Sequence, residues 1–104
     1  MKDMMTNQFK MTNAHFVGVD KDNNPFNIHA VSGYQEYKNQ NIVFLEEPSG
    51  TVVRMTDQGK VTDKISAKHG TFNHKEKVLT LIDNVRVYSS NGDKALTDKM
   101  VIKL

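Results

Sequence analysis

The chain has 104 residues, the length of one ordinary domain, so a two-domain enzyme is not expected. Its 14 basic and 12 acidic residues leave a net charge of +2, and only two of the basic residues are arginine. Nucleic-acid binding is disfavoured, because it relies on clustered arginine and a basic surface. The absence of cysteine excludes disulfides, thiolate-bound zinc and cysteine nucleophiles.

The chain contains no segment with the composition of a membrane-spanning helix. Its longest uninterrupted apolar run is Ile42 to Leu45, against the roughly 20 residues that a spanning helix needs. Residues 1–8 lack the apolar stretch of a secretory signal, so we interpret them as a flexible N-terminal segment or the boundary of an expressed fragment. One folded domain is expected over residues 9–104.

Short apolar runs alternate with turn-forming residues along the chain. Turn-forming residues cluster at 22–25, 47–50, 57–59, 73–76 and 90–93. Between these clusters the apolar residues recur with a period of two, which is typical of strands that bury one face. The pattern predicts an all-β domain. Residues 33–40 are ambiguous, because Tyr34 and Tyr37 would share a helical turn, and we interpret them as an irregular hairpin end.

An internal repeat supports the prediction of stacked hairpins. The spacing Ile-x-Ala-x-x-Gly begins at Ile28 and again at Ile65, 37 residues later, and an apolar strand follows each copy. Hairpins with one apolar face cannot bury that face alone, so they stack into a sandwich, a jelly roll or a solenoid-like layer. The alternative is a chance similarity of two amphipathic hairpins.

The order of the motifs resembles the LptC family of lipopolysaccharide export over residues 9–104. The motifs are Phe-x-Gly at Phe16, a strand entered through Asn24-Pro25-Phe26, Ala-x-x-Gly at Ala67, an Asn-Val hairpin at Asn84, and Leu-Thr-Asp at Leu96. The same repeat is used by the related bridge protein LptA and by the amino-terminal domain of LptD. An LptA-like bridge protein is therefore the nearest alternative.

The resemblance implies a single antiparallel β-jellyroll of two sheets, open along one side, that receives the acyl chains of lipid A between its sheets. Such a protein takes lipopolysaccharide from the inner-membrane ABC transporter and passes it to LptA, without catalysis, metal or other cofactor. It works in the periplasm, tethered to the inner membrane by an N-terminal helix that this sequence lacks. A β-sandwich interaction domain with a dry, closed core is the alternative from a different functional class.

Strand alternation assigns the residues expected to bind lipid, and Val53 is a further inward candidate. The lipid-binding candidates are Phe26, Ile28, Ala30, Ile42, Phe44, Met55, Ile65, Ala67, Phe72, Leu79, Leu81, Val85, Val87, Met100 and Ile102. Small alanines leave room beside larger neighbours, and flexible methionines can repack around a ligand. The same residues would equally form an ordinary closed core.

Two segments are expected to be edge strands that bind partners. The run Ala95 to Leu104 has no proline or glycine, so an unpaired edge there invites the addition of another strand. The resemblance implies that this end binds LptA and that the opposite end, Phe9 to Val17, faces the transporter. Open edges also allow self-association. The edge candidates are Phe9, Met11, Phe16, Leu96, Met100, Val101 and Ile102.

The remaining polar residues do not predict an enzyme. His15, His29, His69 and His74 contain no His-x-His pair and fall at outward positions or in a turn, so we interpret them as surface residues. The chain also lacks a Gly-x-Ser-x-Gly elbow and a glycine-rich phosphate loop.

Overall fold

The computed structural model describes residues 8–104, and these form eight antiparallel strands without a helix. The strands are β1 (Gln8–Val19), β2 (Pro25–Glu36), β3 (Asn39–Glu46), β4 (Ser49–Thr56), β5 (Gly59–Ser66), β6 (His69–Asn73), β7 (Val78–Ser89) and β8 (Lys94–Lys103). Within residues 8–104 there is accordingly no helix that could cross a membrane. The all-β prediction is confirmed. The N-terminal segment predicted over residues 1–8 lies outside the described residues, apart from Gln8, which begins β1.

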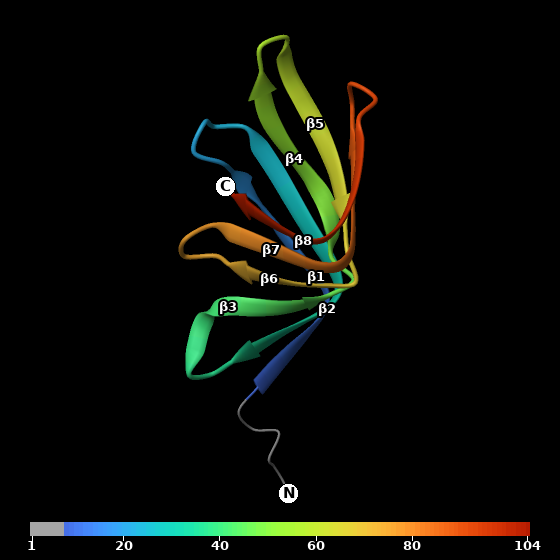
Figure 1. Ribbon diagram of the computed structural model, residues 1–104. Helices are drawn as coiled ribbons and strands as arrows, with labels where there is room; N and C mark the ends of the chain where they lie inside the picture. Colours follow the sequence, from blue (N-terminus) through green and yellow to red (C-terminus); the bar gives the residue numbers. More distant parts are fainter. Residues whose placement is uncertain (1–7) are drawn as a thin grey trace, which may run out of the picture.

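The strands converge along one side of the molecule and fan out into two arms (Figure 1). β2 pairs with β4 over Asn27–His29 and with β3 over Ser32–Glu36, and β7 divides in the same way between β5 and β6. β4 and β5 therefore belong to an upper arm and β3 and β6 to a lower arm, while β1, β2, β7 and β8 run through both. This arrangement is that of a jelly roll.

Local backbone features produce the corner between the arms. Asn13 in β1 and the pair Asp83 and Asn84 in β7 have φ angles of 54°, 66° and 55°, a left-handed conformation that asparagine and aspartate tolerate best. Across the corner, the Glu47 amide donates to the Lys68 carbonyl at 2.8 Å. Irregular residues of this kind bend a strand, so each long strand passes from one arm to the other.

The predicted turns all fall at strand junctions, although most of them overlap the end of a strand, and the ambiguous segment is a hairpin end. β2 continues to Glu36, a two-residue turn follows, and β3 begins at Asn39. The pairing of β2 with β3 shifts register between Gln35 and Glu36, which explains why the sequence pattern is irregular there. The helical alternative for residues 33–40 is wrong.

The sequence repeat has a structural counterpart at the centre of the sheet. Ile28 and Ile65 both pair with Gly50, one from each side of β4. Gly33 and Gly70 flank Leu45 of β3 in the same way. The two copies therefore occupy matching positions around the β3–β4 segment, and the repeat builds both arms of the jelly roll.

The core lies between the two arms and is made by inward residues of β1 to β7 and by Leu104, which follows β8. Its buried hydrophobic residues are Ala14, Phe26, Ile28, Ala30, Val43, Leu45, Val52, Ile65, Phe72, Leu79, Leu81, Val85, Val87 and Leu104. Most of the predicted inward residues of β2, β5, β6 and β7 are among them. In these strands, alternation of polar and apolar residues chose the buried face correctly.

The predicted inward positions of Phe44 and Met55 are wrong. Phe44 is 44% exposed, because the pairing of β3 turns its neighbours Val43 and Leu45 inward. The run Ile42 to Leu45 is apolar throughout, so alternation could not choose its buried face.

In β4 the inward face includes a charged residue, Arg54, and this misled the assignment. Val52 is buried, whereas Met55 is 58% exposed. Ile42 and Val53, which were assigned inward with Phe44 and Met55, are partly exposed.

Candidate functional site: an apolar groove with two mouths

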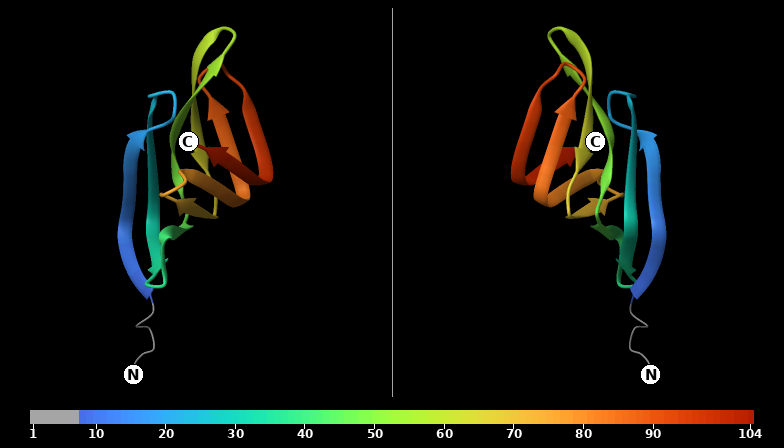
Figure 2. Two further views of the ribbon diagram at one scale, coloured as in Figure 1. Left: turned by 90° about the vertical axis from the view of Figure 1, so that its left-hand side faces the viewer. Right: turned by 90° about the vertical axis from the view of Figure 1, so that its right-hand side faces the viewer.

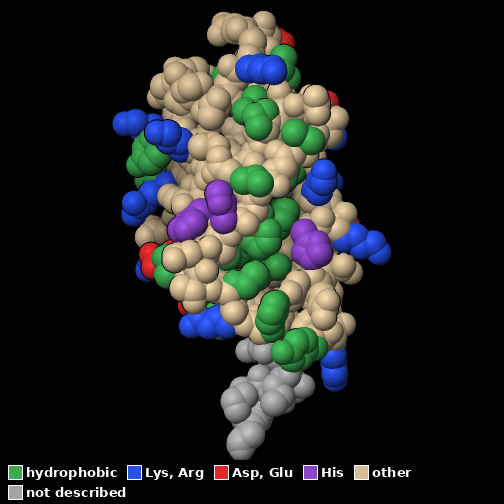
Figure 3. All heavy atoms as spheres, turned by 180° about the vertical axis from the view of Figure 1, so that it is seen from behind, with side chains coloured by type: hydrophobic (Ala, Val, Ile, Leu, Met, Phe, Trp, Pro, Cys, Tyr) green, Lys and Arg blue, Asp and Glu red, His purple; other side chains and the backbone are tan. Residues whose placement is uncertain are grey.

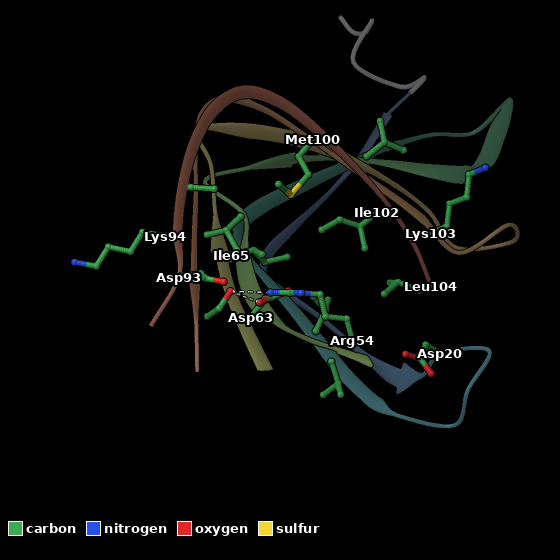
Figure 4. Close-up of a pocket in the computed structure, with 16 residues that line it drawn as sticks. Asp20, Arg54, Asp63, Ile65, Asp93, Lys94, Met100, Ile102, Lys103 and Leu104 are labelled. Carbon is green, nitrogen blue, oxygen red and sulfur yellow. Dashed lines mark hydrogen bonds and ion pairs between the residues drawn. The ribbon is translucent and has the colours of Figure 1, made fainter. Parts of the chain in front are cut away.

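The space between the arms opens first at a pocket of about 550 Å³ between the β4–β5 hairpin and β8, which we call the hairpin mouth (Figure 4). Hydrophobic side chains make up its inner part. These are Val52, Ile65, Val87, Met100, Ile102 and Leu104. Met100 and Ile102 are only partly buried, so the inner face of β8 is not completely covered. This pocket can accept apolar chains.

A polar cluster forms one end of the hairpin mouth. The Arg54 Nε donates to Asp63 Oδ2 at 2.7 Å, and the Ser89 hydroxyl donates to the other carboxylate oxygen of Asp63 (Figure 4). The Asp63 side chain is 8% exposed and that of Arg54 is 47% exposed. The hydrogen bond and the charge of Asp63 raise the pKa of the Arg54 guanidinium above its usual value. The buried carboxylate is therefore paired, as the burial of a charge requires.

A second pocket, of about 480 Å³, lies between β1 and the β6–β7 turn, and we call it the aromatic mouth. Three phenylalanines pack along it, and the ring centroid of Phe72 lies 5.3 Å from that of Phe16 and 6.4 Å from that of Phe26. Gly18 lies over the Phe26 ring, where an added Cβ would come within 3.1 Å of it. Residues on the rim include His15, His74 and Lys77.

A hydrogen-bonded bridge lies between the two mouths and joins the arms. The Lys21 amide of the β1–β2 turn donates to the Leu104 carbonyl at 3.0 Å, and the Leu104 amide donates to the Lys77 carbonyl at 2.8 Å. Lys77 Nζ also donates to the Val19 carbonyl at 3.1 Å. The C-terminus consequently lies beside the β1–β2 turn in Figure 1. Leu104 is 8% exposed, so its side chain completes the core under this bridge.

The residues predicted to bind lipid divide into three groups in the structure. Nine of them belong to the buried core, and Ala67, Met100 and Ile102 are partly buried against it. Ile42 is partly exposed, and Phe44 and Met55 lie on outward positions of β3 and β4. The groove residues that alternation missed are Arg54, Asp63 and Leu104. Asp63 does share the parity of Ile65, which was the available signal, whereas Arg54 lies on the parity opposite to the one assigned inward in β4.

β1 and β8 are the edge strands within residues 8–104, each paired with a single neighbour. They lie on opposite sides of the molecule (Figure 2). In β8, Leu96 is 76% exposed and Val101 is also exposed, as is Phe9 in β1. The other edge candidates, Met11, Phe16, Met100 and Ile102, pack partly against the core. Side chains from each edge strand thus face the groove as well as the solvent.

The outer surface carries scattered hydrophobic side chains and the histidines. On one face, histidines lie on both sides of a group of hydrophobic side chains (Figure 3). His15, His29, His69 and His74 are all exposed. Within the described part of the chain, no three histidine, aspartate or glutamate side chains come together as a metal site would require.

Comparison with known proteins identifies a family that matches this chain. The family model described as "Lipopolysaccharide-assembly, LptC-related" matches residues 2–104. No curated protein matches the chain. The match covers both arms, both mouths and both edge strands.

Proposed function

Because this chain belongs to the LptC-related family of lipopolysaccharide assembly, we propose that its groove binds the acyl chains of lipid A during transport to the outer membrane. The family supports a role in lipopolysaccharide transport, and its members are transport proteins of the periplasm. Beyond this general role, we propose that acyl chains insert between the arms.

The incompletely covered apolar pocket at the hairpin mouth carries the proposal. Its hydrophobic lining extends from buried Val52 and Ile65 in the upper arm to partly buried Met100 and Ile102 in β8. Each methylene group moved from water into such a lining gains about 0.8 kcal/mol. The flexible thioether of Met100 can adapt to chains of different shape. An acyl chain would complete a core that the protein alone leaves open.

The two edge strands supply a route for transfer between neighbouring proteins. We propose that β8 adds to a strand of LptA and that β1 faces the inner-membrane transporter, since each has an unpaired edge within residues 8–104. Joined in this way, the jelly rolls would align their grooves. We also propose that a segment preceding the domain tethers it to the inner membrane.

Photo-crosslinking in cells tests lipid binding with a matched pair of methionines. A photoreactive phenylalanine analogue replaces Met100, which lines the groove, or Met55, which is on the outside of β4. Lipopolysaccharide adducts are expected from position 100 and not from position 55. If a folded and correctly located protein gives no adduct at position 100, the proposal that the groove binds lipid is wrong. The domain would then be a closed sandwich that works through its edges.

A further inference from the structure

The two mouths of the groove differ in charge. The lining of the hairpin mouth contains three carboxylates and three basic side chains, so its charges balance. They are Asp20, Asp63, Asp93, Arg54, Lys94 and Lys103. The lining of the aromatic mouth contains Lys77, His15 and His74 and no aspartate or glutamate. Only the aromatic mouth therefore combines an apolar interior with a rim that favours a negative charge.

The Lys77 ammonium is placed to contact a ligand at this mouth. Its Nζ donates one of its three hydrogen atoms to the Val19 carbonyl at 3.1 Å. This bond holds the ammonium across the opening and leaves two donors free. Asp20, the acidic residue next to Val19, lines the other mouth, and its carboxylate accepts the amides of Asp22 and Asn24. An ammonium in this position binds phosphate or carboxylate as a point charge.

The interior behind Lys77 suits an acyl chain. Phe16 and Phe26 both approach Phe72, which is 3% exposed, and the aromatic rings lead from the mouth into the core. Leu104, on the bridge bonded to Lys77, lines the hairpin mouth on the other side. A chain entering at the aromatic mouth would thus run beneath the bridge toward the hairpin mouth.

From this asymmetry we infer that the aromatic mouth binds the anionic group, phosphate or carboxylate, of an amphiphile whose acyl chain lies in the groove. The inference rests on the proposed lipid-binding function and adds an orientation to it. The anionic end lies at Lys77, and the apolar end points toward Ile65 and Met100 at the hairpin mouth.

The test compares dodecyl phosphate with dodecyl maltoside, which share one chain and differ in charge. Calorimetry at low salt should show that the protein binds the phosphate about twofold to fivefold more tightly, the range expected for one exposed charge pair. Lys77→Met should abolish this preference, and Lys77→Arg should retain it. Lys94→Met, at the hairpin mouth, is the matched control and should leave the preference unchanged.

Two further probes identify the source of the preference. Dodecanoate tests whether a carboxylate suffices, and inorganic phosphate tests whether the anion binds without its chain. Equal affinity for the two dodecyl probes, or a preference that survives Lys77→Met, would overturn the inference while leaving lipid binding intact. If neither dodecyl probe binds at all, the proposed function itself is wrong. Amide chemical shifts at Gly18 should respond to the phosphate probe and confirm its location.

Discussion

Gly50 is the residue at which the packing of the upper arm tolerates no side chain. It lies in β4 between Ile28 of β2 and Ile65 of β5. A Cβ there would lie 2.1 Å from the Asn27 carbonyl oxygen, a backbone atom held within the sheet. We expect Gly50→Ala to lower the free energy of unfolding by about 3 kcal/mol or more, measured by urea denaturation.

Gly18→Ala provides the comparison for this prediction. Its added Cβ would meet the Phe26 ring at 3.1 Å, and a side chain can move where a backbone cannot. The loss of stability should be about 1 kcal/mol. Equal losses in the two variants would show that the backbone clash at Gly50 is relieved.

Glu46 makes the stability of the lower arm depend on pH. Ser32 and Tyr34 both donate to Glu46 Oε1, at 2.9 and 3.0 Å, and these hydrogen bonds lower the pKa of the carboxyl group. The folded state therefore binds this proton more weakly than the unfolded state. The stabilisation is fully present above the ordinary glutamate pKa and is lost as the pH falls through the lowered value.

The variant Glu46→Gln tests this pH dependence. Wild type should be more stable than the variant at pH 7, and the difference should shrink as the pH falls toward about 3. Chemical denaturation across this range measures it. A difference that stays constant with pH would mean that the Glu46 carboxylate does not contribute through these hydrogen bonds.

The unpaired edges of β1 and β8 predict self-association. β8 and β1 each leave one edge unpaired within residues 8–104, and exposed Leu96 and Val101 accompany the edge of β8. Such an edge can add a strand of a second copy. The weight-average mass in sedimentation experiments should therefore rise with protein concentration.

Charge on β8 should suppress this association. The double variant Leu96→Lys and Val101→Lys should stay monomeric at concentrations where wild type associates, since added lysine protects an edge. Met55→Lys, at an exposed position of the interior strand β4, is the control and should associate like wild type. Equal association of all three proteins would exclude β8 as the contact.

The corner also changes which alternate residues are buried in β1 and β2. Ala30 and Gly33 of β2 are both buried although they are three residues apart, and Met11 and Ala14 of β1 pack inward with the same odd spacing. These two strands keep a period of two within one arm and change parity at the corner. In β7, where two consecutive residues are left-handed, Leu81 and Val85 on either side of the corner keep the same parity and are both buried.

For the whole molecule, the bridge at Leu104 is a hydrogen-bonded contact between the two arms. It joins the β1–β2 turn to the β6–β7 turn through the backbone of one residue, between the two mouths. We expect a reducible bis-maleimide cross-link between cysteines in the double variant Lys21→Cys and Glu76→Cys, at exposed positions of these two turns, to slow the exchange of bound dodecyl phosphate, measured by stopped flow. Reduction should restore the rate, and the chain contains no native cysteine to interfere.

The same cross-link within one arm is the control for this prediction. Thr51 and Lys64 pair directly across β4 and β5, so cysteines at these positions would link two strands of the upper arm alone. Exchange should then continue at the wild-type rate. If the cross-link between the arms leaves the exchange rate unchanged as well, the arms do not need to part for a ligand to move.

The sequence alone determined the strands, the turns and the family. Alternation in β2, β5 and β7, turn residues such as Asn24-Pro25, and the repeat beginning at Ile28 and Ile65 are local signals, because each depends on neighbours along the chain. They were sufficient to predict an all-β domain of stacked hairpins and most of its core, whereas the jelly roll was implied by the resemblance. The resemblance built on them agrees with the family model.

Three features follow only from the assembled fold: the buried face of β3 and β4, the pairing of Arg54 with Asp63, and the position of Leu104 between the two mouths. Each of these features depends on contacts between residues far apart in sequence. The bridge joins Lys21 to Leu104, and Val43 is buried because β3 lies between β2 and β6. A one-dimensional pattern carries no information about such contacts, so the charge asymmetry of the groove emerges only when the arms are assembled.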